Sequence, residues 1–397
     1  MIFHRTSCRL GVLLIVFASP LVSVVDAQVA PSALLVSVGA ATATQPAQRL
    51  TSGVATGRFY VVGSDIIAPD GTKFIPIGAN VGAKMVSWNP PTYAFTSQGH
   101  VATGHANDAV AWGWNTVRVN VVCNPGAGVT LQETINGVQA LIDEYTPRHI
   151  VVMPECHDVT GADADLSDPR WVLIHQFWDA ILAANGSNPY VWVNYVNEPY
   201  TGSAAGDPKW AGTAQTLYDR VRSKGTENLF VWEFTSWGQG ADDIAGTDVG
   251  TALAAGKCNI VFSWHNYGAA GNASQMTSWA TSLKSKGLAV IVGEVGYDWA
   301  GNRSQTTTYA NDLRGAQWSF DNAYTLGFGV LYWHATGASA ASNNLYSLRQ
   351  NGLGGWYDTT APLSAAGTRL LQLGTNKPAP TRPNVSLVNS HCASANG

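Results

Sequence analysis

The sequence predicts a single-domain α/β fold, the closed (β/α)8 TIM barrel. Eight runs rich in β-branched and aromatic residues recur along the chain, and their starts are 29 to 42 residues apart. Each interval is long enough for a helix, as in 171–184 and 214–223. Nearly continuous apolar strands are typical of parallel sheets buried on both faces. The expected strands are 74–80, 116–122, 149–155, 190–197, 229–235, 259–266, 288–294 and 328–334.

An open, doubly wound sheet is the alternative architecture. That fold usually carries a Gly-rich phosphate-binding loop after its first strand. The corresponding segment here, 77–82, lacks the G-x-G-x-x-G spacing. We therefore expect the closed barrel, with a short hairpin over 57–73 covering the bottom of its strands.

Composition limits the classes of function. The 397 residues are 46% hydrophobic, so the chain can bury a large core. Only 12% are charged and the net charge is −4, which favours neither nucleic acid nor an anionic membrane as a partner. The 15 tryptophans are numerous. Aromatic faces fill cores, but they also stack on sugar rings, so we expect some of them to line a cleft.

The two ends of the chain predict a secreted protein with one folded domain. Residues 1–27 read as a secretory signal, with a basic start, an apolar stretch too short to span a membrane and a small-residue cleavage site. A flexible lead-in over 28–52, a catalytic domain over 53–376 and a Pro-rich tail over 377–397 follow. We expect a monomer that is not attached to a membrane after cleavage.

Four cysteines remain in the mature chain, and an even number in an exported protein permits disulfides. Cys123 and Cys156 follow the ends of two neighbouring expected strands, so their bridge is the favoured one. Cys258 and Cys392 complete the set.

Polar residues gather at the carboxyl ends of the expected strands, where barrels of this kind place their active sites. Asn197-Glu198-Pro199 ends the fourth strand and Glu294 ends the seventh. Glu233 ends the fifth, so position alone does not select the first two. The Asn-Glu-Pro context favours Glu198, because an amide beside an acid can bind a sugar hydroxyl and Pro fixes the turn. Two such carboxyls are what acid-plus-nucleophile cleavage of a glycosidic bond requires.

Two other chemistries compete with that interpretation. His157, Asp158, His265 and Glu294 contain metal-ligating atoms, but no H-E-x-x-H or paired-Cys spacing is present. A Ser-His-Asp hydrolase is the other, and the chain has no G-x-S-x-G motif. We therefore expect neither a metal nor another cofactor.

In its motifs the chain resembles glycoside hydrolase family 5, the retaining (β/α)8-barrel glycanases, and is similar within it to bacterial-type endo-β-1,4-mannanases. The resemblance covers about residues 70–340. Its motifs are Val117-Arg118-Val119, His157-Asp158-Val159-Thr160-Gly161, Asn197-Glu198-Pro199-Tyr200, Trp237-Gly238-Gln239, His265-Asn266-Tyr267, Gly293-Glu294-Val295-Gly296 and Trp333.

The resemblance implies a role for each matched residue. Glu198 is the expected general acid/base and Glu294 the expected nucleophile. The other matched residues bind substrate or support this pair: Arg118 and Tyr267 hydrogen-bond Glu294, Asn197 holds the sugar 2-hydroxyl, His265 tunes Glu198, His157 braces the site or contacts substrate, Trp333 stacks under the reacting ring, and Trp237 belongs to the mannanase-like motif.

The resulting hypothesis is a secreted endo-acting enzyme that cleaves β-1,4-mannosidic linkages with retention. Its expected partner is a β-linked polysaccharide such as mannan, glucomannan or a cellulose-type chain. An endo-β-1,4-glucanase with the same mechanism is the alternative. An inactive barrel that only binds polysaccharide is a further one, although no expected catalytic group is missing.

Overall fold

The computed structural model describes residues 57–82, 103–124, 130–162, 165–203, 208–268, 271–297, 307–335, 346–350 and 356–382. The expected signal segment and lead-in, and residues 383–397 of the expected tail, lie outside these ranges. Eight parallel strands form the centre of the fold: β4 (Ile77–Gly82), β5 (Thr116–Val121), β6 (Val151–Cys156), β7 (Val193–Asn194), β8 (Phe230–Glu233), β9 (Ile260–His265), β10 (Val290–Glu294) and β11 (Val330–Tyr332).

These strands close into a barrel, as the sequence predicts. They form two four-stranded sheets, ordered β11-β4-β5-β6 and β7-β8-β9-β10. Parallel bridges join the sheets at both seams, with Cys156 opposite Val196 at one and Val295 opposite Tyr332 at the other. All eight expected strands are confirmed. Strand β7 is shorter than the expected 190–197 because its flanks pair only through isolated bridges.

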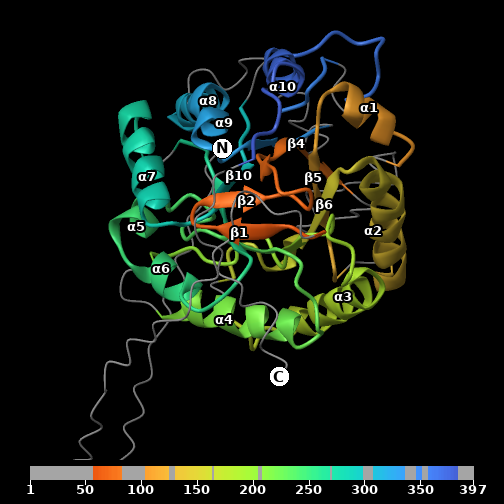
Figure 1. Cartoon of the computed structure of the whole chain (residues 1–397), viewed down its shortest axis with the longest axis vertical. Helices are drawn as coiled ribbons and strands as arrows, with labels where there is room; N and C mark the ends of the chain where they lie inside the picture. Colours follow the sequence, from red (N-terminus) through yellow and green to blue (C-terminus); the bar gives the residue numbers. More distant parts are fainter. Residues whose placement is uncertain are drawn as a thin grey trace, which may run out of the picture. The chain divides into compact units, whose positions relative to one another are not determined.

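Helices surround the ring of strands (Figure 1). Helix α4 begins at Lys209, before the expected residue 214, because Trp210 and Thr213 extend its buried face. Within the described part of the chain, no helix has the length and apolar character needed to cross a bilayer. The helices are α1 (Ala106–Ala111), α2 (Leu131–Tyr145), α3 (Arg170–Asn185), α4 (Lys209–Arg222), α5 (Ala241–Gly246), α6 (Val249–Ala254), α7 (Ala273–Ser285), α8 (Thr307–Trp318), α9 (Tyr324–Leu326) and α10 (Ala365–Thr375).

The alternation of side chains along each strand divides the core into two parts. In β5, Val117, Val119 and Val121 belong to the large cluster between strands and helices. A second cluster fills the barrel interior with the alternate side chains of other strands, among them Met153 and Val231. Strand residues are therefore buried on both faces, which explains their continuous apolar sequence.

The barrel interior changes from apolar to polar along its axis. In β6, Val151 and Met153 are followed on the same face by Glu155, and in β8 Val231 is followed by Glu233. These glutamates are fully buried. These two inward-facing rows thus begin in hydrocarbon at the amino end and finish with a charged group at the carboxyl end.

A small antiparallel sheet covers the amino end of the barrel, as expected. Its strands are β1 (Tyr60–Val62), β2 (Asp65–Ile67) and β3 (Lys73–Phe74). Phe59, just before β1, packs edge-on against Trp192 of the barrel interior at a centroid distance of 5.2 Å. Figure 1 shows β1 and β2 lying across the ring of strands. Water is thereby excluded from the apolar half of the interior.

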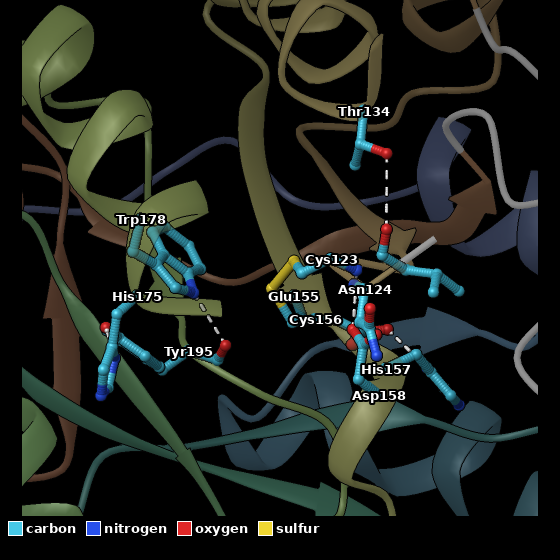
Figure 2. The surroundings of a disulfide bond; sticks show 11 residues. Cys123, Asn124, Thr134, Glu155, Cys156, His157, Asp158, His175, Trp178 and Tyr195 are labelled. Carbon is cyan, nitrogen blue, oxygen red and sulfur yellow. Dashed lines mark hydrogen bonds and ion pairs between the residues drawn. A yellow bond between two sulfur atoms is a disulfide. The ribbon is translucent and has the colours of Figure 1, made fainter. Parts of the chain in front are cut away.

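The expected disulfide between Cys123 and Cys156 is confirmed (Figure 2). Pairing of β5 with β6 places Val121 opposite Cys156, which brings the two cysteines to a Cα–Cα distance of 5.5 Å. Asp158 secures the same corner, because its carboxylate accepts hydrogen bonds from the backbone N–H groups of Cys123 and Asn124, both at 2.7 Å. Cys258 is disulfide-bonded as well.

Replacing both Cys123 and Cys156 by serine should lower the free energy of unfolding by about 4 kcal/mol. The bridge spans a sequence separation of 33 residues, and opening it restores chain entropy to the unfolded state. Urea unfolding of the double variant and the oxidised wild type measures the difference. A change below about 1 kcal/mol would show that Asp158 and strand pairing suffice to hold this corner.

Candidate active site

Arg118 lies at the centre of the polar half of the barrel. It is fully buried in the middle of β5, and its guanidinium is surrounded by acceptors from strands around the barrel. Burial alone would lower its pKa, but three glutamates raise it above its usual range, so the side chain is a permanent cation. Its partners are Glu294 at 2.6 Å, Asn194 and Asn197 each at 2.7 Å, Asn80 at 2.9 Å, Glu233 at 3.1 Å and Glu155 at 3.7 Å.

Glu198 and Glu294 face each other at the carboxyl ends of the strands. A carboxylate oxygen of each lies within 4.8 Å of the other and of a ring nitrogen of His265. The side chain of Glu198 is 15% exposed and that of Glu294 is 4% exposed. The two predicted carboxyls are therefore close together, at the surface of one cleft.

The backbone after β7 aims Glu198 into this cleft. Glu198 has φ +39°, a left-handed conformation that is uncommon outside glycine and costs on the order of 1–3 kcal/mol. The loop is held in place because the Gly161 N–H donates to the Glu198 carbonyl at 2.8 Å, and the Trp237 N–H donates to the Tyr200 carbonyl at 2.9 Å. The strained residue is thus fixed from two neighbouring loops.

The two carboxyls have different surroundings. Both oxygens of Glu294 accept hydrogen bonds, one from Arg118 at 2.6 Å and the other from the Tyr267 hydroxyl at 2.9 Å. Such bonds stabilise the ionised form. Burial raises the pKa of Glu198, and the charge of Glu294 adds to this effect, while His265 opposes it. Glu198 therefore holds a proton more readily than an ordinary glutamate.

His265, the last residue of β9, contacts both Glu198 and the buried Glu233. Its Nδ1 lies 2.7 Å from Glu198 Oε1, and its Nε2 forms an ion pair with Glu233 Oε2 at 2.6 Å. Burial would lower the pKa of His265, but Glu233 and Glu294 outweigh it and raise the value to about 10. Burial would likewise raise the pKa of Glu233, but His265 and Arg118 lower it to about 2.

Asn197 is held by a second histidine–glutamate pair. Its Oδ1 accepts from Arg118, and its Nδ2 lies 3.1 Å from His157 Nε2 and donates to Thr160 Oγ1 at 3.0 Å. Behind the ring, His157 Nδ1 lies 2.8 Å from Glu155 Oε1. Because Arg118 can only donate, the orientation of the Asn197 amide is fixed.

An open cleft of about 300 Å³ lies over these groups. Trp333 follows β11, and its ring lies 5.8 Å from that of His157. Trp237 is 45% exposed, unusual for so large an apolar side chain. The lining comprises His157, Asn197, Glu198, Trp237, Gln239, Tyr267, Glu294 and Trp333. Every predicted site residue thus lines the cleft or, like Arg118 and His265, lies directly beneath it.

The four candidate metal ligands named in the sequence do not meet at one point; among the described residues, His265 and Glu294 group with Glu198 instead. Asp158 accepts hydrogen bonds from the backbone N–H groups of residues 123 and 124. A histidine binds metal through an unprotonated nitrogen. The ring nitrogens of His265 both face carboxylates, Nδ1 toward Glu198 and Nε2 toward Glu233.

The sequence analysis missed the role of three polar residues inside strands. Glu155, Asn120 and Asn194 are fully buried and bonded into the polar half of the barrel. Asn120 donates to Glu155 at 2.7 Å, and Asn194 accepts from Arg118. The available signal was the alternation of side chains along a strand. Asn120, for example, is two residues after Arg118 and so points to the same face.

A (β/α)8 barrel with two carboxyls opposed in a cleft at the carboxyl ends of its strands defines the class of barrel glycoside hydrolases. The family described as cellulase (glycosyl hydrolase family 5) matches residues 81–339. The chain belongs to glycosyl hydrolase family 5.

Curated relatives are mannanases by name. The mannan endo-1,4-beta-mannosidase of Streptomyces lividans is 26% identical over 245 residues, which cover 60% of this chain and 58% of that protein. The enzyme of the same name from Cellvibrio japonicus is 26% identical over 242 residues, covering 60% of this chain and 52% of its own length. The chain thus spans a little over half the length of these relatives.

Solved structures share the fold. The catalytic domain of a mannanase from Streptomyces sp. SirexAA-E is 22% identical, with a TM-score of 0.58 over 80% of this chain and 90% of that one. An endoglucanase from Thermobifida fusca in complex with cellotetraose is 19% identical, with a TM-score of 0.60 over 81% of this chain and 98% of that one. Both likenesses support the (β/α)8 barrel.

Proposed function

We propose that the chain is a secreted endo-β-1,4-mannanase that cleaves with retention of configuration. The observation that carries this proposal is the pair Glu198 and Glu294, with carboxylate oxygens within 4.8 Å and unlike surroundings. Retaining glycosidases place their carboxyls about 5–5.5 Å apart, whereas inverting enzymes need about 6.5–9.5 Å to admit a water. The short separation favours direct attack on the sugar.

In the first step Glu294 attacks the anomeric carbon, and the bond to the leaving oxygen breaks as Glu198 gives that oxygen its proton. In the second step Glu198 takes a proton from water, and the water oxygen displaces Glu294 from the sugar. Arg118 and Tyr267 each donate a hydrogen bond to Glu294 and orient its carboxylate for attack. Asn197 holds the 2-hydroxyl, His157 braces that amide, and Trp333 and Trp237 provide stacking surfaces.

Mannan is the proposed substrate because both curated relatives described above are mannan endo-1,4-beta-mannosidases. An endo-β-1,4-glucanase is the second candidate, favoured by the likeness to the endoglucanase with cellotetraose. Mannose and glucose differ only in the configuration at C2. Contacts to the 2-hydroxyl, in which Asn197 takes part, are therefore expected to decide between them.

A panel of polysaccharides tests the proposal. The secreted chain should release reducing ends from linear mannan and glucomannan at least about 10-fold faster than from carboxymethylcellulose, a preference worth about 1.4 kcal/mol. Viscosity should fall early, as in endo cleavage, and proton NMR should show the β-anomer of the product first. The Glu294→Ala variant controls for contaminating activity.

Faster release of reducing ends from carboxymethylcellulose than from mannan would identify the chain as an endo-β-1,4-glucanase. First appearance of the α-anomer would exclude retention. Tight binding of every polysaccharide without release of reducing ends would show that the chain is an inactive, polysaccharide-binding barrel.

A further inference from the structure

Glu233 is a buried carboxylate for which double displacement has no direct use. It is fully buried at the end of β8 and does not line the cleft. Each of its oxygens faces a cation, with Oε1 at 3.1 Å from Arg118 Nη2 and Oε2 at 2.6 Å from His265 Nε2. An unpaired charge at this depth would be costly, and these two cations, together with a hydrogen bond from the Asn194 side chain, stabilise it.

The His265 ring has carboxylates next to both of its nitrogens. Glu233 of β8 faces its Nε2, while Glu198 after β7 and Glu294 of β10 face its Nδ1 at 2.7 and 3.6 Å. Arg118 of β5 contacts two of these glutamates, Glu233 and Glu294. A Cβ on Gly238 would come within 2.6 Å of the His265 ring, so the backbone at 238 lies directly against it.

We propose that Glu233 is a positioning residue that keeps His265 a doubly protonated imidazolium, so that Nδ1–H donates to Glu198 and cannot accept its proton. A neutral imidazole with a free Nδ1 would compete with the glycosidic oxygen for that proton. The imidazolium leaves the proton of Glu198 to the substrate and stabilises the carboxylate that forms when the proton leaves. Only the effect on Glu198 rests on the proposed function; the charge of His265 does not.

The ionisation of the pair agrees with this geometry. The pKa of His265 is raised to about 10 and that of Glu233 is lowered to about 2. Both groups are therefore charged throughout the range in which Glu198 must exchange its proton.

Glu155 provides a matched comparison on the other side of β7. It too is fully buried and lies 2.8 Å from a histidine nitrogen, here Nδ1 of His157. The opposite nitrogen of His157 faces the Nδ2 donor of Asn197, not a carboxylate. His157 therefore lacks the second carboxylate that His265 has. The barrel thus holds two histidines that are each backed by a buried glutamate, and only His265 has carboxylates on both sides of its ring.

The test compares Glu233→Gln with Glu155→Gln in the full-length protein carrying ¹⁵N-labelled histidine. In the wild type, both ring nitrogens of His265, assigned by their loss in His265→Asn, should stay protonated from pH 5 to 8.5. In Glu233→Gln the amide can donate to Nε2, so His265 should titrate at least about two pH units lower. Glu155→Gln should leave the titration of His265 unchanged.

The pH dependence of kcat/KM provides the second measurement, because its alkaline limb reports loss of the proton of Glu198. Removing the positive charge 2.7 Å from Glu198 raises the pKa of that acid. The limb of Glu233→Gln should therefore move up by about one pH unit, and that of Glu155→Gln should not move. Glu233→Asp, which retains the charge, should keep His265 protonated.

A His265 that is neutral in the wild type, or that titrates identically in Glu233→Gln, would overturn the proposal, and the first result needs no variant. If His265 lost its charge in Glu233→Gln but the alkaline limb of kcat/KM did not move, the proposed effect of His265 on Glu198 would be wrong. If the wild type hydrolysed no β-linked polysaccharide, the proposed function would fail, while the NMR titration would still report on the ion pair.

Discussion

Replacing Glu294 with alanine should reduce polysaccharide hydrolysis by on the order of 10⁴-fold or more while the protein stays folded. The variant lacks the group that forms the bond to the anomeric carbon, and Glu198 alone cannot complete double displacement. Initial rates on mannan, with circular dichroism to check folding, measure the effect. Azide should partly restore turnover of an activated aryl mannoside, because it can occupy the space of the lost carboxylate and give an α-mannosyl azide.

Glu198→Gln is the matched control for that result. It should lose about 10³-fold on polysaccharide, whose leaving oxygen needs a proton. With a dinitrophenyl leaving group, which departs without a proton, formation of the glycosyl-enzyme should be far less affected. Turnover near the wild-type rate in either variant on mannan would remove these two residues from their proposed roles.

Replacing Arg118 with methionine should lower the free energy of unfolding by about 3–5 kcal/mol at pH 7. Its positive charge faces Glu294, Glu233 and Glu155, and methionine would leave buried carboxylates without that counterion. Because these acids can take up protons instead, the loss of stability should shrink as the pH falls. Urea unfolding at pH 7 and pH 5 measures both the size and the direction.

Arg58→Met serves as the control for this variant. Arg58 forms an ion pair with Glu227 in which its own side chain is 60% exposed. Removal of such a surface pair should change stability by no more than about 0.5 kcal/mol. Equal effects at Arg58 and Arg118 would mean that the buried cation does not balance the charges of the barrel interior.

The fold could be predicted from sequence because its signal is repetitive. Each apolar strand must be buried on both faces, so eight such runs with helical intervals leave few architectures. The site followed because the carboxyl ends of the strands converge, which places Glu198 beside Glu294. The disulfide followed from the same logic, since Cys123 and Cys156 end neighbouring strands.

What could not be predicted depends on side-chain direction and pairing. Glu233 looked like a rival catalytic acid in the sequence, but both its oxygens are occupied by Arg118 and His265 beneath the cleft. Glu155 drew no attention, because a single glutamate at a strand end carries no sign of its histidine partner. The choice of sugar depends on contacts to the 2-hydroxyl, which no strand pattern encodes.

The sheet β1–β3 closes the apolar amino end of the barrel, and this affects how protons reach the active site. Within the described part of the chain, hydrocarbon lies on one side of the charged layer, and the cleft opens the other side to bulk water. A polysaccharide lying in the cleft would close that opening. From binding until cleavage, the charged groups beneath the cleft would then exchange no protons with bulk water. The protonation state at capture would decide whether a bound chain is cut.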